Sequence, residues 1–168
     1  KSRDQMHDEL AAEKARTEEM LLNILPKRIA AELKDNGAVE PRFYNSASIM
    51  FSDFSGFTKL AEQMQPKALI ELLHQYFVTF DNIVARHNVE KLKTIGDAYM
   101  CAAGLPSECR GHAIATCFAA LDIQNHMAKM NKQREKLRMP RWDMRIGIHS
   151  GPVIAGVVGE KKFTYDIW

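Results

Sequence analysis

Apolar positions along the chain follow two periods, and the shorter period marks the strands. The apolar run Ile49 to Phe51 predicts a buried strand that ends at Asp53 and turns at Ser55-Gly56. Residues 90–100 contain two alternating segments that meet at Gly96-Asp97. This pattern predicts a β-hairpin with the acid Asp97 at its tip.

A second hairpin is expected near the end of the chain. Residues 144–149 and 153–158 alternate or run apolar around Ser150-Gly-Pro152, and residues 163–168 begin a further extended segment. The first strand is expected after a polar connection that runs from Gly37 to Asn45.

Helical spacing predicts the remaining elements. We expect helices over residues 1–25, 27–34, 58–64, from Pro66 onward, and 111–136. In the helix that begins at Pro66, the inward face is predicted to hold Leu69, Leu72, Leu73, Tyr76, Phe77, Phe80, Ile83 and Val84. In the last helix it is predicted to hold Ile114, Cys117, Phe118, Leu121 and Met127. The order of elements indicates an α+β fold with helices on one face of a mostly antiparallel sheet.

The first helix has a weak apolar seam. Leu10, Thr17 and Ile24 share one heptad position, and Met6, Glu13 and Met20 share the other. Because two of these six residues are polar, a weak parallel coiled coil and a solvated single helix both remain open.

Composition limits the class of protein. The 168 residues are 46% apolar and 26% charged, which suits one globular domain. A net charge of +2 argues against a nucleic-acid partner, and the three cysteines, expected as buried side chains, suit a reducing compartment. The chain has no apolar run long enough for a membrane span and no signal-peptide pattern, so we expect a cytoplasmic location. Because it begins at Lys and stops at Trp168, we expect a fragment of a longer protein.

The two acids at the ends of predicted strands carry the chemistry. A hairpin beside the first strand would bring Asp97 next to Asp53. Two carboxylates that close repel each other unless divalent cations lie between them, so the pair predicts two-metal chemistry on phosphates. If Asp53 is considered without Asp97, the alternative is structural, because many strands end in Asp-x-x-Gly only to form a turn.

Four blocks of the sequence resemble one known family. The segments FSDFSGFTKL, KLKTIGDAYMCAAGLP, MRIGIHSGPVIAGVVG and FTYDIW resemble the catalytic domain of class III adenylyl and guanylyl cyclases over residues 20–168. The resemblance implies a ferredoxin-like βαββαβ core. It also implies a signalling helix over residues 1–25, a transducer helix and linker over 26–45, and a catalytic domain over 46–168 that is incomplete at its C-terminus.

The resemblance assigns roles to individual residues. It implies two Mg²⁺ or Mn²⁺ ions held by Asp53, Asp97 and Phe54, and an arginine, Arg145, that reaches phosphate. The backbone amides of Phe54, Ser55, Gly56, Phe57 and Thr58 would cradle the β- and γ-phosphates. An arginine in an apolar strand is costly to bury without an anion, although a salt bridge to a nearby acid is the alternative for Arg145.

The base can be inferred from hydrogen-bond complementarity. Lys93 and Asp166 stand where adenylyl members of the family carry a Lys donor and an Asp acceptor for adenine. The alternative for Lys93 is an exposed lysine on a strand, and the alternative for Asp166 is an acid that accepts a hydrogen bond from an N–H group in a turn. We therefore expect an adenylyl cyclase that binds ATP, with a guanylyl cyclase and a non-catalytic nucleotide-binding module as alternatives. A palm-type nucleotidyl or diguanylate synthase fits less well, because no Gly-Gly-acid-acid hairpin is present.

The family also implies partners. Its members form head-to-tail homodimers with composite sites, and a segment like residues 21–26 joins the domain to an upstream sensory or membrane region. An Asn, an Arg and a phosphate-binding Lys of the family lie beyond Trp168, so this segment alone is expected to be weakly active or inactive.

Overall fold

The computed structural model describes residues 3–22, 24–159 and 163–168. The chain divides into two compact units. The larger unit comprises Tyr44–Val153, and the smaller comprises the residues up to Phe43 together with Ile154–Trp168.

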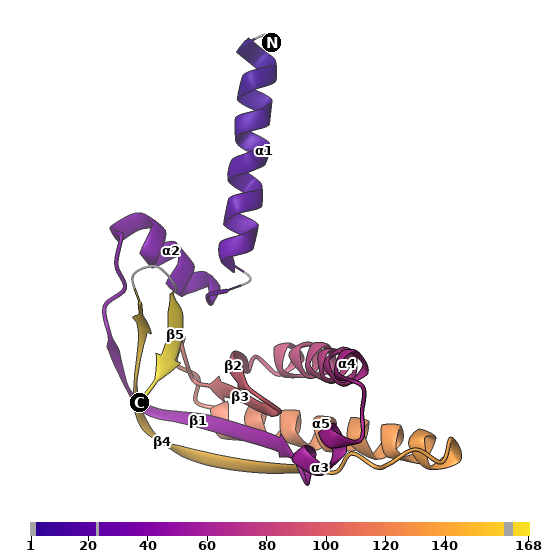
Figure 1. The fold of residues 1–168 in the computed structure, drawn as a ribbon. Coiled ribbons are helices and arrows are strands. Elements are labelled where there is room, and N and C mark those ends of the chain that lie inside the picture. Colours follow the sequence, from indigo (N-terminus) through magenta and orange to yellow (C-terminus); the bar gives the residue numbers. More distant parts are fainter. Residues whose placement is uncertain (1–2, 23, 160–162) are drawn as a thin grey trace. The chain divides into compact units, whose positions relative to one another are not determined.

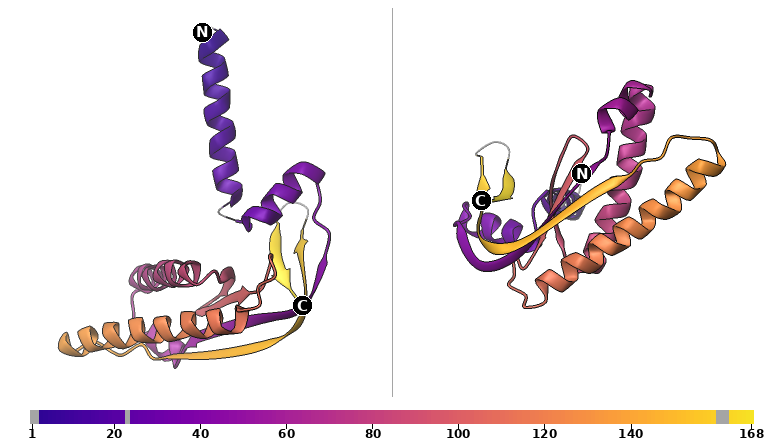
Figure 2. Two further views of the ribbon diagram at one scale, coloured as in Figure 1. Left: turned by 180° about the vertical axis from the view of Figure 1, so that it is seen from behind. Right: turned by 90° about the horizontal axis from the view of Figure 1, so that it is seen from below.

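The larger unit has the expected βαββαβ order. It contains most of β1 (Arg42–Phe54), all of α3 (Phe57–Glu62), α4 (Pro66–Arg86), β2 (Glu90–Ile95), β3 (Ala98–Ala103) and α5 (His112–Lys136), and the first part of β4 (Met144–Val158). The strands lie in the order β2-β3-β1-β4, so β1 and β4 run side by side (Figures 1 and 2). This arrangement confirms the predicted α+β fold with a ferredoxin-like core.

Strand register brings the two predicted turns together. β1 pairs antiparallel with β3, with Ser52 opposite Tyr99. β2 pairs antiparallel with β3 up to Ile95 opposite Ala98, which leaves Gly96 and Asp97 at the tip of the hairpin. The C-terminal end of β1 therefore lies beside the hairpin tip.

One hydrophobic core joins the sheet to both long helices. Buried residues of β1, β3, α4 and α5 belong to one cluster, so α4 and α5 cover the same face of the sheet. The α4 stripe lies in or against this core, as its helical spacing predicts. The cluster consists of Met50, Phe54, Leu73, Tyr76, Phe80, Ile83, Val84, Val89, Tyr99, Cys101, Ala103, Ala119, Ala120, Ile123, Met127, Trp142 and Met144.

Two strand predictions were wrong. β1 begins at Arg42, within the expected connection, and its burial alternates, so that Met50 is buried while Phe51 is 45% exposed. A strand with one covered face alternates in this way, so the run Ile49 to Phe51 is not buried throughout as predicted. The hairpin expected at Ser150-Gly-Pro152 is one continuous strand, β4, whose last residues pair with β5 (Thr164–Ile167).

The inward face of α5 was also predicted wrongly. Thr116, Ala119, Ala120, Ile123 and Met127 are buried, and only Met127 was expected there. This face combines the small residues Thr116, Ala119 and Ala120 with Ile123 and Met127, so the size of the apolar side chains does not identify it. Ile114, Phe118 and Leu121 are exposed, and so are two of the cysteines, Cys109 and Cys117.

The smaller unit contains the N-terminal helices and the β4–β5 pair. α1 (Arg3–Leu22) and α2 (Lys27–Asn36) lie close to their predicted bounds. α2 ends at Gly37, whose φ of 72° suits glycine and whose amide donates to the carbonyl of Leu33. Met6 and Leu10 of the apolar seam are more than half exposed, so the coiled coil stays a prediction. No helix in the described part of the chain is long and apolar enough to cross a membrane.

Candidate active site

Asp53 lies near the end of β1 and is held by an arginine from the adjacent strand. Arg145, the second residue of β4, donates from Nε and Nη2 to the two carboxylate oxygens of Asp53, each at 2.8 Å. This bidentate geometry is the strongest that an arginine and a carboxylate form. The alternative considered for Arg145, a salt bridge to a nearby acid, is therefore present in the structure.

Asp97 reaches the same place from the hairpin tip. Gly96 adopts a φ of +60°, which lets the chain turn directly before Asp97. The Oδ2 atom of Asp97 accepts a hydrogen bond of 3.1 Å from the amide of Phe54, the residue after Asp53. Asp53 and Asp97 thus converge at the end of β1, as the sequence predicts.

The charges of these groups act on one another. Hydrogen bonds from Arg145 to Asp53, followed by the charges of Asp53 and Asp97, raise the pKa of the Arg145 guanidinium above its usual range. The arginine therefore remains protonated and balances part of the negative charge that the two acids bring together.

Asp53 and Arg145 line an open hollow of about 270 Å³. Its other lining residues are Phe51, Ser52, Ala98, Ile146 and Gly147. Within the described residues, no cluster of three or more His, Cys, Asp or Glu side chains could hold a metal ion. Carboxylate oxygens and the backbone carbonyl of Phe54 are nonetheless the hard oxygen ligands that Mg²⁺ and Mn²⁺ prefer, and such sites commonly take their other ligands from water and substrate phosphate.

The expected phosphate cradle is partly engaged within the protein. The amide of Phe54 donates to Asp97, and the amide of Ser55 donates to the carbonyl of Asp143 at 2.8 Å. Gly56 has a φ of 69° and immediately precedes α3, which begins at Phe57. Any phosphate contact from this turn as it stands would come from the amides of Gly56, Phe57 and Thr58.

Arg145 is exposed rather than buried. Its position in an apolar strand suggested a buried guanidinium, but the side chain is 71% exposed. The reason is that Arg145 points away from the helix-covered face, on which its neighbour Met144 is buried. Its importance rests on its contact with Asp53 instead.

The two candidate base-recognition residues lie in different units. Lys93 is half-buried in β2, directly after a register shift between Lys91 and Lys93. Asp166 lies in β5, and its Oδ1 atom accepts a hydrogen bond of 2.9 Å from the amide of Ile167. Asp166 thus makes the N–H contact considered as its alternative role, and its pairing with Lys93 across one base stays a prediction.

A polar network that sequence reasoning missed fixes the hairpin. Asp81 of α4 accepts from the Tyr99 hydroxyl at 2.8 Å and from Lys91 Nζ at 2.9 Å. Burial, with the hydrogen bond to Asp81 as a further cause, raises the pKa of Tyr99. Lys91 and Tyr99 lie 10 and 18 positions from Asp81 in the sequence, so no local pattern reveals the contact.

Comparison with known proteins identifies the family. The family model described as the adenylate and guanylate cyclase catalytic domain matches residues 39–168. Guanylyl cyclase C of Sus scrofa is 41% identical over 158 residues, which cover 94% of this chain and 14% of that protein. An adenylate cyclase of Mycobacterium bovis is 38% identical over 160 residues, which cover 95% of this chain and 35% of that protein. The chain thus spans about a seventh and about a third of the lengths of these two relatives.

A solved structure agrees with the sequence relatives. The catalytic core of a rhodopsin-guanylyl cyclase with converted specificity, crystallised with ATPαS, is 34% identical with a TM-score of 0.68. The match covers 77% of this chain and 68% of that one. Together with the βαββαβ core and the meeting of Asp53 with Asp97, these matches show that the chain belongs to the family of class III adenylyl and guanylyl cyclase catalytic domains.

Proposed function

We propose that this domain belongs to an adenylyl cyclase, which converts ATP to 3′,5′-cyclic AMP and pyrophosphate. The observation that carries the proposal is the meeting of Asp53, Asp97 and Arg145 at the end of β1, where Asp97 accepts from the amide of Phe54. Two acids and an arginine beside an open hollow suit a triphosphate with divalent cations.

In the proposed reaction the ribose 3′-oxygen forms a bond to the α-phosphorus and gives up its proton to solvent water. The bond from the α-phosphorus to the oxygen that bridges to the β-phosphate breaks, and pyrophosphate leaves. Two Mg²⁺ or Mn²⁺ ions, when bound, would lower the pKa of the 3′-hydroxyl and neutralise charge on the phosphates. Asp53, Asp97 and the carbonyl of Phe54 would hold them.

The protein would then contribute position and charge. Arg145 would bind phosphate oxygens with the same bidentate geometry that it forms with Asp53. The amides of Gly56, Phe57 and Thr58 would meet the terminal phosphates at the start of α3. Little covalent work falls on side chains in this reaction, so rate depends on how rigidly these groups are held.

The choice of ATP rests on Lys93 and Asp166. A Lys donor matches N1 of adenine and an Asp acceptor matches its exocyclic amine, whereas guanine presents the reverse pattern. Binding guanine would leave buried polar groups unpaired, which is a strong basis for discrimination. The identity of 41% to a guanylyl cyclase favours GTP as the second candidate substrate.

A complete site would need two chains. The hollow of about 270 Å³ lies slightly below the roughly 300–1,000 Å³ of typical small-molecule pockets, and Lys93 does not line it. We therefore propose a homodimer in which one copy supplies the metal-binding acids and its partner supplies the base pocket. The N-terminal helix would transmit the state of an upstream sensory or membrane region to this interface.

Product analysis tests the proposal. The full-length protein is incubated with Mn-ATP and, in parallel, with Mn-GTP, and the products are identified by mass spectrometry. Cyclic AMP with an equal amount of pyrophosphate is expected, together with its loss in the Asp53→Ala variant. Cyclic GMP as the main product would reassign the substrate, and bound ATP without any product would make the domain a non-catalytic nucleotide sensor.

A further inference from the structure

The segment that joins α5 to β4 packs directly against the proposed phosphate-binding turn. Trp142 is fully buried, and its ring lies 5.0 Å from that of Phe54 in a T-shaped arrangement and 6.1 Å from that of Phe57. The carbonyl of the next residue, Asp143, accepts the hydrogen bond from the amide of Ser55. The turn that follows Asp53 is thus held by a ring contact at each end and a backbone hydrogen bond between them.

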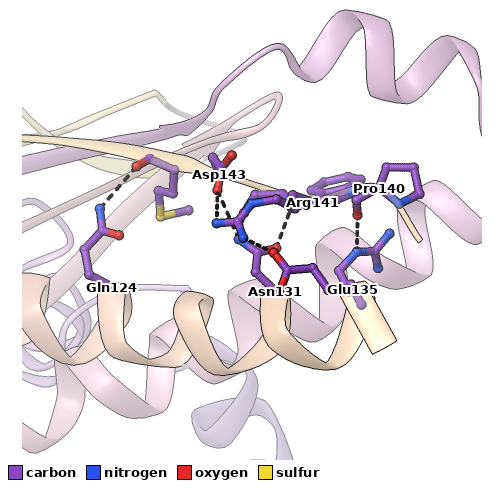
Figure 3. Close-up of polar contacts among 9 residues, drawn as sticks. Gln124, Asn131, Glu135, Pro140, Arg141 and Asp143 are labelled. Atoms are coloured by element: carbon purple, nitrogen blue, oxygen red, sulfur yellow. Dashed lines mark hydrogen bonds and ion pairs between the residues drawn. The ribbon is translucent and has the colours of Figure 1, made fainter. Parts of the chain in front are cut away.

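This supporting segment is itself held by one side chain. Asn131 of α5 is 3% exposed, and its Nδ2 donates to the carbonyl of Trp142 at 3.1 Å while its Oδ1 accepts from the amide of Trp142 at 2.9 Å. Nδ2 also lies 3.2 Å from Oδ1 of Asp143 (Figure 3). Trp142 lies outside any strand, so the Asn131 side chain satisfies both backbone groups that a strand partner would otherwise satisfy.

We infer that Asn131 is a positioning residue for the proposed phosphate- and metal-binding turn and acts through Trp142 and Asp143. The inference rests on the proposed function and extends it to a residue that lies 76 positions from Ser55 in the sequence. Loss of the Asn131 side chain leaves the amide and carbonyl of Trp142 buried without these partners. The segment must then shift to find water, and the turn it supports shifts with it.

A neighbouring glutamine provides a matched control. Gln124 lies two turns earlier on α5, and its Nε2 donates to the carbonyl of Met144 at 3.2 Å (Figure 3). Both Gln124 and Asn131 thus use a side-chain amide of α5 to bind a backbone carbonyl. For Gln124 this carbonyl lies at the start of β4, and for Asn131 it lies just before β4. The carbonyl that accepts from Ser55 belongs to Asp143 and not to Met144, so we expect Gln124→Ala to report the cost of such a contact with little effect on the turn.

A second control separates the carboxylate of Asp143 from its carbonyl. Asp143→Ala removes the exposed side-chain contacts to Arg141 and Asn131 but keeps the carbonyl that accepts from Ser55. We therefore expect the turn to keep its position in this variant. Asn131→Ala and Asp143→Ala should differ, although both remove a contact of the same network.

The experiment compares these variants in the full-length protein. Deuterium exchange over residues 53–58 reports how well the amides of the turn are protected. Steady-state kinetics with Mn-ATP report kcat and KM at a temperature where circular dichroism shows every variant folded. Asn131→Ala should speed exchange of the Ser55 amide about tenfold, the effect of a modest loss of local stability. It should lower kcat/KM about ten- to hundredfold, as expected for misplaced reacting groups. The two controls should stay within about twofold of wild type, because surface and remote contacts contribute little to the turn.

Two results would overturn the inference. One is unchanged exchange of the Ser55 amide in Asn131→Ala, and the other is a loss of kcat/KM that Gln124→Ala reproduces, since that would reflect general destabilisation. Failure of the proposed function looks different, because wild-type protein itself would then release no cyclic nucleotide. The exchange measurement would still decide whether Asn131 holds the turn.

Discussion

Asp97 makes one observed contact and has one proposed role, and two substitutions can separate them. Its carboxylate is a proposed metal ligand, and its Oδ2 atom accepts a hydrogen bond of 3.1 Å from the amide of Phe54. Asparagine keeps an oxygen that can accept this hydrogen bond but has no charge, whereas alanine has neither. Asp97→Asn should therefore lose turnover with the fold intact, and Asp97→Ala should lose both turnover and stability.

The size of each effect follows from the contacts of Asp97. Loss of one hydrogen bond to a backbone amide costs about 0.5–1.5 kcal/mol, which lowers the melting temperature of a chain this long by roughly 1–6 °C. Asn should avoid this cost, and it also relieves repulsion between Asp97 and Asp53. Removal of one group that stabilises developing charge typically lowers kcat by a factor of about 10²–10³. Removal of a metal ligand should lower kcat by at least as much.

The assay combines calorimetry with a Mn²⁺ titration of cyclic nucleotide formation. Asp97→Asn should melt within about 1 °C of wild type and retain less than about one hundredth of its turnover at saturating Mn²⁺. Turnover above about a tenth of wild type in Asp97→Asn would refute the two-metal assignment. Equal destabilisation by Asn and Ala would refute the role given to the Phe54 amide.

Three further predictions concern other parts of the molecule. Arg145→Ala should tighten Mn²⁺ binding, measured by titration calorimetry, because Asp53 loses its bidentate partner. The same variant should raise KM for ATP about tenfold or more, because the proposed phosphate contact is lost. The double variant Lys93→Glu with Asp166→Ser should shift substrate preference toward GTP. The ratio of kcat/KM for GTP to kcat/KM for ATP should rise by a factor of about 10² or more in paired kinetic assays. Burial lowers the pKa of His126 below its usual 6.5. The unfolded state therefore binds the proton more tightly, so unfolding free energy should fall as pH drops below about 6.5 in urea titrations, and His126→Phe should flatten that dependence.

Local patterns were sufficient to predict most elements and the convergence of the two acids. Helices from Lys27 and Pro66 begin where their sequence signals predict, and the hairpin tip lies at Gly96-Asp97. Because the turn residues and the alternation define the hairpin, antiparallel pairing beside β1 was enough to place Asp97 near Asp53. These are features that depend on neighbours in the sequence.

Features that depend on distant partners could not be predicted in this way. The sequence of α5 has large apolar residues on more than one face, and only contact with the sheet selects the face with Ala119 and Ala120. The Ser150-Gly-Pro152 segment has turn chemistry, yet its neighbours in the sheet keep it within β4. The support of Ser55 by Asp143 joins positions 88 residues apart, and nothing local to either residue indicates it.

The exposed ion pair between Arg145 and Asp53 is compatible with a site that must accept charged substrate. Their side chains are 71% and 40% exposed, and pairs in such surroundings contribute little to stability, so separating them costs the fold little. The guanidinium matches the oxygens of phosphate as well as those of a carboxylate. If Arg145 turned to a phosphate, as proposed, both oxygens of Asp53 would become available as cation ligands. A single arginine would then balance the charge of Asp53 in one arrangement and bind the triphosphate in the other.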